Sequence, residues 1–321
     1  MKNINNHGFF ITIPAITIAL FTTSTMATSA LAKDKQCACT NTSRVTLDAC
    51  RNNTAGDFWT AVGKCYNLVG RQTREQCKAE AQSEKREDKQ VCGDQFEARL
   101  NVCERLGEKP YDPRINPTNF VDPTQIGGTV LPNLYFPLIA GTTRTYDSND
   151  GQTITVSVTG LTKVILGVTC RVVHDVVEED GQVIEDTEDW FAQDVQGNVW
   201  YFGEISQDLE DGELVSLNGS WKAGVDGAKA GIIMKASPHA GDVYRQEFAL
   251  GEAEDMAQVL SLTDSATVPA ASCNGNCLVT EDFTPLEPGV VENKYYAPGI
   301  GAILEVNPET GTRVELVEID D

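Results

Sequence analysis

The residues most able to do chemistry in this chain are acidic and lie on two strand-like runs that meet at Gly197. If a type I turn with a bulge joins the runs, Glu188 pairs with Glu204, whereas a two-residue turn pairs Asp189 with Glu204. In either register Glu204 faces another carboxyl group across the ladder. Like charges directly opposite each other destabilise a sheet. The presence of two facing carboxyl groups therefore suggests that their surroundings offset the repulsion or that the pair has a function.

Three interpretations of this acidic pair stay open at the level of sequence. The pair could lie on a solvated outer face, where water and salt absorb the repulsion. It could hold a cation, either Ca²⁺ or the guanidinium of Arg171 or Arg245. It could also line a pocket in which the acids share a proton and act as general acid and base, with Glu188, Asp189 and Glu204 as the catalytic candidates.

Aromatic residues beside the acids could form a wall that faces a ligand. The alternative is that they are simply core, which is the commoner role of aromatic residues on strands. The candidate ligand-binding residues are Trp190, Asp194, Trp200, Tyr201, Phe202 and Arg245.

Other motifs of catalysis are missing from the sequence. It holds no G-x-S-x-G, P-loop, dinucleotide fingerprint, H-E-x-x-H or haem-attachment motif. His174 lies within an apolar run and is interpreted as structural, and His239 is placed in a loop. We predict no metal site with confidence, and calcium is the one cofactor considered.

The first 32 residues have the pattern of an export signal. Lys2 precedes a mostly apolar run within residues 8–31, and Ala30-Leu31-Ala32 has the small-x-small form of a cleavage site. An uncleaved anchor is the alternative. We expect the mature chain to begin near Lys33, to be secreted or periplasmic, and not to span a membrane.

An exported protein enters an oxidising compartment, so we interpret the ten cysteines first as disulfide-bonded. Zinc is the competing one, but no C-x2-C pair is present. Cys273 and Cys277 form the easiest local pair, because Asn-Gly-Asn between them permits a tight loop. Seven cysteines precede residue 104, so either one of them pairs with Cys170 or one thiol stays free. Cys170 is expected to be buried or bridged.

Charge divides the chain into two regions. Residues 33–114 hold 15 basic and 13 acidic side chains, whereas residues 115–321 hold 9 basic and 34 acidic ones. The total charge of −22 argues against nucleic-acid binding. We therefore divide the chain into a signal peptide (1–32), a Cys-rich helical region (33–109), a linker (110–132) and an acidic β-barrel-like domain (133–321).

The helical region is rich in Glu, Lys, Arg and Ala with a thin apolar stripe, which predicts a disulfide-stapled hairpin of helices. It is interpreted as a spacer or cap, and docking of a protein partner through it is the alternative. The acidic domain contains about ten alternating, strand-like runs separated by turn signals. The fold predicted is mainly β: an antiparallel meander that forms an up-and-down barrel or half-barrel. The strand-like runs are 153–159, 164–177, 182–193, 198–205, 214–221, 243–250, 258–262, 294–296, 302–306 and 313–319.

Three blocks of the acidic domain resemble those of a family of uncharacterised secreted bacterial proteins. The blocks are Phe136-Pro137-Leu138 with Gly141-Thr142, residues 189–204 (DWFAQDVQGNVWYFGE) and Thr284–Gly301 (TPLEPGVVENKYYAPGIG). The closing Tyr-Ala-Pro-Gly-Ile-Gly segment is also similar to one in half-barrel proteins of the cell envelope, some of which carry lipids or lipoproteins. The resemblance implies a fold and an envelope setting and supplies no catalytic residues.

The function that we expect from these patterns is non-catalytic binding of a small or lipidic ligand within the barrel. Two other classes stay open. One is a hydrolase or isomerase that uses the paired carboxylates, and the other is an extracellular matrix or surface protein that binds calcium.

Overall fold

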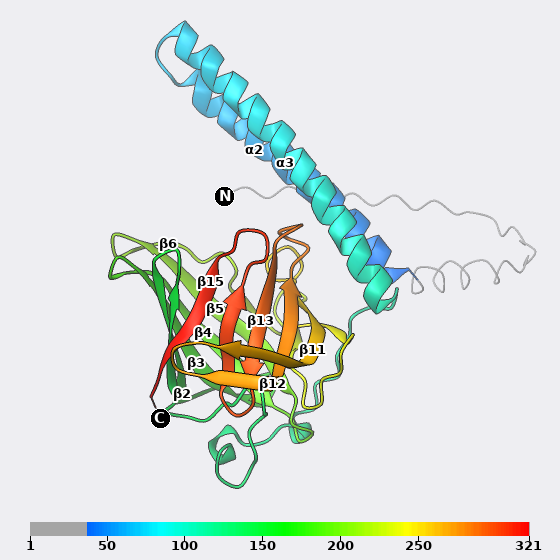
Figure 1. Ribbon diagram of the computed structural model, residues 1–321. Helices are drawn as coiled ribbons and strands as arrows, with labels where there is room; N and C mark the ends of the chain where they lie inside the picture. Colours follow the sequence, from blue (N-terminus) through cyan, green and yellow to red (C-terminus); the bar gives the residue numbers. More distant parts are fainter. Residues whose placement is uncertain (1–36, 321) are drawn as a thin grey trace, which may run out of the picture.

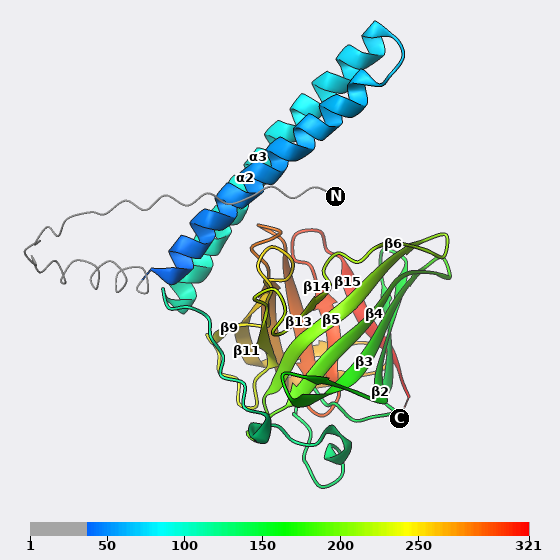
Figure 2. The ribbon, with the colours of Figure 1, turned by 180° about the vertical axis from the view of Figure 1, so that it is seen from behind.

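The computed structural model describes residues 37–320, which form a barrel of strands and a long helical arm (Figures 1 and 2). The predicted signal peptide therefore lies outside the described residues. Within them, no helix is both long and apolar enough to cross a membrane.

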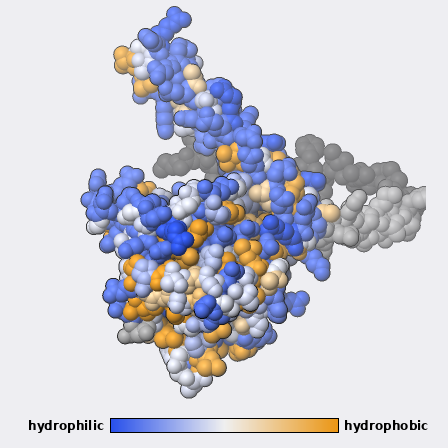
Figure 3. Space-filling model, viewed as in Figure 1, coloured by the Kyte–Doolittle hydropathy of each residue, from blue (hydrophilic) through white to orange (hydrophobic). Residues whose placement is uncertain are grey.

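The arm is an antiparallel pair of helices, α2 (Ala38–Tyr66) and α3 (Arg71–Leu106). Few of its side chains are buried, and Figure 3 shows that its surface is mostly hydrophilic. Three disulfides join the helices along their length: Cys39–Cys103, Cys50–Cys92 and Cys65–Cys77. The predicted stapled hairpin is thus confirmed, and cross-links replace the apolar core that the sequence lacks.

Each end of α3 is defined by a glycine in the left-handed region. Gly70 (φ 95°) precedes the helix, and Gly107 (φ 86°) ends it while its N–H donates to the Cys103 carbonyl. The helix continues through Gly93, which keeps Cys92 and Cys103 on the side that faces α2. Of the first seven cysteines, only Cys37 stays unpaired.

The base of the arm docks on the barrel through a buried ion pair. Arg99 of α3 donates to both carboxylate oxygens of Glu254, with the shortest distance 2.7 Å from NH2 to Oε1. Both residues are buried. Gln95 adds a hydrogen bond of 2.8 Å to the Leu286 carbonyl.

Residues 107–142 cross one end of the barrel. The segment predicted as a linker contains two short 3₁₀ helices, η1 (Pro117–Asn119) and η2 (Pro123–Gln125). Phe120 packs edge-on against Phe202 with ring centroids 5.5 Å apart, and Ile126 is buried. This stretch thus packs against the barrel as it connects the two regions.

The rest of the chain forms one sheet in which all neighbouring strands are antiparallel, in the order β10-β8-β5-β4-β3-β2-β1-β15-β14-β13-β12-β11-β9, with β6 and β7 on the side of β5. The strands are β1 (Thr143–Ser148), β2 (Gln152–Ile165), β3 (Val168–Glu179), β4 (Gln182–Gln193), β5 (Val199–Glu210), β6 (Glu213–Ser216), β7 (Trp221–Lys222), β8 (Lys229–Met234), β9 (Val243–Arg245), β10 (Glu247–Phe248), β11 (Met256–Thr267), β12 (Ser272–Phe283), β13 (Val291–Ala297), β14 (Gly301–Val306) and β15 (Arg313–Asp320). The predicted antiparallel meander is confirmed as a nearly closed barrel of 13 strands.

The two ends of this sheet are neighbours in sequence. Only Gln246 separates β9, which pairs with β11, from β10, which pairs with β8. One extended segment therefore pairs with both edges and nearly closes the barrel. This segment passes so near β8 that a Cβ on Gly231 would lie 2.2 Å from the Gln246 carbonyl oxygen.

Two local expectations need correction. The run 164–177 is not one strand, because Leu166 and Gly167 adopt positive φ and form the turn between β2 and β3. Cys273 and Cys277 do form a disulfide, as predicted, but the segment between them belongs to β12 and not to a loop. The register between β11 and β12 shifts at this point, which accommodates the short cross-link.

Candidate functional site

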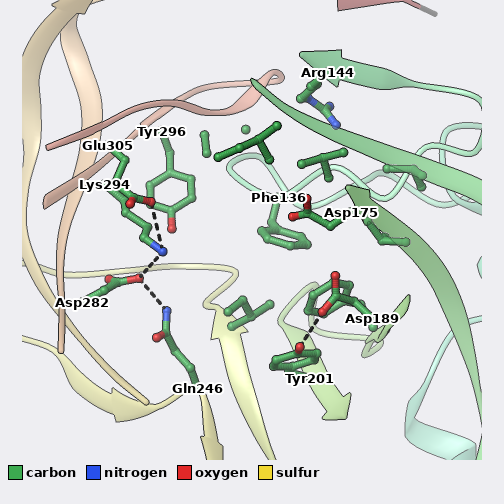
Figure 4. A pocket seen from close by; sticks show the side chains of 18 of the residues that line it. Phe136, Arg144, Asp175, Asp189, Tyr201, Gln246, Asp282, Lys294, Tyr296 and Glu305 are labelled. Atoms are coloured by element: carbon green, nitrogen blue, oxygen red, sulfur yellow. Dashed lines mark hydrogen bonds and ion pairs between the residues drawn. The ribbon is translucent and has the colours of Figure 1, made fainter. Parts of the chain in front are cut away.

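The barrel contains a cavity of about 410 Å³ that is partly open to solvent. Its interior is therefore not packed solid with side chains. The lining combines aliphatic and aromatic side chains with charged groups from several strands, and charged groups lie on both sides of the cavity (Figure 4). Its charged lining residues are Arg144, Asp175, Asp189, Glu204, Glu247, Asp255, Asp282, Lys294 and Glu305.

A bulge at Gly203 brings two functional side chains of β5 onto the same face. Tyr201 and Glu204 both line the cavity although they are three residues apart, which a regular strand does not allow. Opposite them, Phe191 pairs with Tyr201 and Asp189 pairs with Glu204, so two residues of β5 face one of β4. Gly203 permits this because its φ is +129°.

Asp189 and Glu204 form the centre of the acidic wall. The Tyr201 hydroxyl donates a hydrogen bond of 2.5 Å to Asp189. Burial and the charge of Glu204 raise the pKa of Asp189 to about 7. Burial likewise raises the pKa of Glu204 to about 7, although the Tyr201 hydroxyl opposes this shift. These two groups therefore change protonation near neutral pH.

Two further carboxyl groups extend the wall. Burial and the charges of Asp189 and Glu185 raise the pKa of Asp175 on β3 to about 7. Glu247 on β10 is 6% exposed, and burial raises its pKa well above the usual range. One oxygen of each, Oδ1 of Asp175 and Oε2 of Glu247, is buried and has no hydrogen-bond partner among the described residues.

The opposite wall holds a compensated charge network around Lys294 of β13. Its ammonium lies 3.3 Å from Glu305, 3.6 Å from Glu292 and 3.7 Å from Asp282. Glu305 and the other acids raise the pKa of Lys294 well above its ordinary value. Gln246 donates to Asp282 at 3.0 Å and so connects this network to the segment that closes the barrel (Figure 4).

An aromatic series forms the apolar side of the cavity. Phe136 contacts Phe191 with ring centroids 5.1 Å apart, and Phe191 stacks on Tyr201 at 4.6 Å. Phe136 is positioned by Asn133, whose side-chain oxygen accepts hydrogen bonds from the Tyr135 and Phe136 N–H groups. The three sequence blocks noted above thus all contribute to the lining, through Phe136, Asp189 and Lys294 among others.

The three acids predicted as catalytic candidates lie on opposite faces of the sheet. Asp189 and Glu204 face the cavity, whereas Glu188 is exposed and pairs with Ile205. The predicted opposition of Glu204 to a carboxyl group is confirmed, with Asp189 as the partner. Trp190 shares the outward face of β4 and lies under Lys163, whose ammonium is 3.3 Å from the ring centroid.

Of the predicted ligand-binding residues, the structure places only Tyr201 in the cavity lining. Asp194 anchors the turn after β4, where it accepts hydrogen bonds from Asn198 and from the Trp200 indole. Phe202 is fully buried in the core. Arg245 and Trp200 line a second hollow of about 450 Å³ between the arm and the barrel, where the Arg245 guanidinium lies 4.7 Å from the Phe248 ring.

Sequence reasoning missed Asp175, Glu247, Asp282 and Lys294. One signal was available for Asp175, because it lies between Val173 and Val177 in the same phase of its strand. Lys294 offered a second signal, because basic residues are rare in the acidic region that contains it. Their convergence depends on closure of the barrel, which no local pattern reveals.

Among residues 37–320, no group of three or more His, Cys, Asp or Glu side chains is arranged to hold a metal ion. The cysteine outside the disulfides in the barrel, Cys170, is buried, and burial raises the pKa of its thiol to about 12. Comparisons with protein-family models, with curated proteins and with solved structures give no match to this chain.

Proposed function

We propose that this protein is an extracytoplasmic, non-catalytic binding protein that holds one small or lipidic ligand inside its barrel. The observation that carries the proposal is the cavity of about 410 Å³, whose lining combines apolar side chains with several carboxyl groups. Small-molecule pockets have volumes of about 300–1,000 Å³ and combine an apolar lining with a few polar groups.

The energetics of the interior support this proposal. Small barrels can fill their interior with side chains, and burial of carboxyl groups costs free energy unless they are paired. A lining of Val, Ile and Leu at Asp175, Asp189 and Glu204 would make a more stable protein. The cavity and its acids are therefore better explained by a ligand than by stability.

The four disulfides support a location outside the cytoplasm, since such bonds persist in oxidising compartments. This agrees with the export signal predicted for residues 1–32. A protein purified from an oxidising compartment of its own host is therefore the right material for the test.

Binding can be tested with a neutral, environment-sensitive dye, N-phenyl-1-naphthylamine. Val156→Trp fills the cavity from β2, and Thr155→Trp, at the neighbouring position outside the lining, is the matched control. We expect the natural protein and Thr155→Trp to enhance dye fluorescence, and Val156→Trp to lose most of the enhancement. If Val156→Trp binds the dye as well as the control does, the cavity is not the binding site.

Native mass spectrometry identifies what the cavity holds. A retained organic molecule in the natural protein, absent from Val156→Trp, supports the proposal. Absence of a ligand together with a melting temperature that rises with Ca²⁺ and falls with a chelator would favour the calcium-binding alternative.

A second candidate function rests on the Asp189–Glu204 pair itself. Two carboxyl groups that titrate near neutrality beside a tyrosine hydroxyl can act as general acid and base. The test is to incubate the co-purified molecule, or a small-molecule extract of the host, with the natural protein and with Glu204→Gln. Conversion by the natural protein alone, with equal retention of the molecule by both, would favour an enzyme.

A further inference from the structure

The acidic wall of the cavity consists of four carboxyl groups that form no ion pair with a described residue. Of the ion pairs formed between described residues, none includes Asp175, Asp189, Glu204 or Glu247. These four groups come from β3, β4, β5 and β10, so the fold itself assembles them on one side of the cavity. Each is close enough to another that its charge raises a neighbour's pKa.

Hydrogen-bond donors are also scarce on this wall. An ionised carboxylate accepts several hydrogen bonds, yet Oε2 of Glu247 and Oδ1 of Asp175 accept none from the described residues. The Tyr201 hydroxyl supplies one donor, to Asp189. Glu247 is 6% exposed, so bulk water supplies few donors, and the protein donors beside its carboxyl group are the Trp221 indole N–H and the Asp255 backbone N–H. The wall therefore needs either protons or a donor from the ligand.

The two basic groups of the cavity do not reverse this balance. Lys294 is surrounded by Glu305, Glu292 and Asp282 and so presents no net positive charge. Arg144 donates through Nε to the Ile300 carbonyl at 2.8 Å and keeps its positive charge, but it is one cation in a lining that holds seven carboxyl groups. An anionic ligand would meet net repulsion, and a neutral one would leave the acids unpaired.

Aromatic rings stand beside the acids. Phe191 stacks on Tyr201, and Phe136 packs against Phe191 from the other side. Aromatic faces together with carboxylates form the environment that recognises ammonium groups, because both attract positive charge and the rings accept the adjoining apolar carbons.

We propose that the ligand of the cavity is an organic cation: an amine whose ammonium lies against Asp189, Glu204 and Glu247 and whose apolar portion lies along Phe136 and Phe191. This inference rests on the proposed function and specifies the chemical class of the ligand. The ammonium supplies the donors that the wall lacks and compensates its charge.

The proposal links binding to proton release. An amine binds the ionised wall, so at neutral pH it displaces the protons that burial keeps on Asp175, Asp189 and Glu204. Affinity for the amine is expected to rise from about pH 5.5 to about pH 8. The other charged or titratable groups that face these acids are His174, Glu185, Tyr201, Glu247, Asp255, Asp282, Lys294 and Glu305.

The test compares octylamine, octanol and octanoate, which share one apolar chain and differ in charge. Each is titrated by calorimetry and by displacement of N-phenyl-1-naphthylamine. We expect octylamine to bind at least about tenfold more tightly than octanol, and octanoate to bind least. Calorimetry in buffers of different ionisation enthalpy should show protons released with octylamine and none with octanol.

Glu204→Gln and Glu247→Gln keep the shape of the wall and remove its charge, so each should reduce the preference for octylamine over octanol. Glu188→Gln removes a charge from the outward face of β4 and should leave the preference unchanged. Melting curves establish that each variant is folded. If octanol binds as tightly as octylamine, the cationic class is wrong while the binding function stands. If neither the dye nor any of the three compounds binds, the binding function fails and this inference fails with it.

Discussion

Asp189 and Glu204 occupy directly opposite positions on β4 and β5, and both carboxyl groups line the cavity. The sheet thus keeps two like charges face to face in a place where water is limited. Such a pair is normally avoided or neutralised. Here the pair is kept although its repulsion destabilises the fold. Substitution of either acid is therefore a direct test of the site.

The acidic wall should make the protein less stable as the pH rises. The folded-state pKa of Asp175, Asp189 and Glu204 is about 7, above the ordinary values of 3.8 and 4.5. Between about pH 4 and 7 the folded state therefore binds more protons than the unfolded state. The free energy of unfolding should fall through this window, as measured by urea denaturation at a series of pH values.

Asp189→Asn should flatten this pH dependence and raise the free energy of unfolding at about pH 8 by about 1–2 kcal/mol. Glu188→Gln removes the same charge from an exposed position one residue away and should leave the slope as it is. Equal effects of the two substitutions would mean that general charge repulsion in an acidic protein, and not the cavity, sets the pH dependence.

Gly203 should be required for the shape of the site. A Cβ at this position would lie 2.3 Å from the Trp221 carbonyl oxygen, in a backbone conformation with φ +129°. Gly203→Ala must therefore move β7 or remove the bulge that turns Glu204 inward. We expect a loss of about 3 kcal/mol or more in the free energy of unfolding and loss of dye binding.

Gly151→Ala is the matched control for this prediction. Gly151 also has positive φ, at +106°, but a Cβ there would contact nothing within 4 Å. It should cost only the conformational strain, about 1–2 kcal/mol, and leave dye binding intact. If Gly203→Ala is no more costly than Gly151→Ala and still binds the dye, the bulge does not position the site.

The fold could be predicted from sequence because its signals are local. Alternation along residues 153–159 and the turns at Gly151, Gly181 and Gly197 set a meander of strands without reference to distant residues. β12 was missed because the Cys-Asn-Gly-Asn-Cys segment has turn chemistry, and the disulfide within the strand overrides it.

The site could be predicted only in part. The hairpin pattern showed that Glu204 would face an acid, but two registers were open, and the bulge at Gly203 decides between Glu188 and Asp189. The aromatic residues around Trp190 divide between the two faces of the sheet because successive side chains along a strand alternate. Lys294 comes from a strand nearly a hundred residues later and reaches the cavity through closure of the barrel.

The arm should depend on the Arg99–Glu254 ion pair for its position. Arg99→Met leaves the buried Glu254 carboxylate without its bidentate partner, which typically costs about 3–5 kcal/mol. We expect the arm to detach, seen as a larger radius of gyration in solution scattering and faster hydrogen exchange at the base of α3. The barrel strands should keep their protection.

Arg313→Met provides the comparison for Arg99→Met. Arg313 and Glu315 are 2.6 Å apart, but their side chains are 41% and 33% exposed. Loss of such a pair costs about 0–1 kcal/mol and should leave the scattering profile unchanged. A normal profile for Arg99→Met as well would show that other contacts, such as Gln95 with the Leu286 carbonyl, are sufficient to hold the arm.

The two unpaired cysteines should differ sharply in reactivity. Cys37 is partly exposed, whereas Cys170 is fully buried, and burial raises the pKa of its thiol to about 12. The thiolate is the reactive form, so Cys170 should resist alkylation near pH 8. Iodoacetamide should label Cys37 alone in the folded protein and both cysteines after unfolding without reductant, as read by peptide mapping. Labelling of Cys170 in the folded state would contradict its burial in β3, and a disulfide between Cys37 and Cys170 would contradict the free state of both thiols.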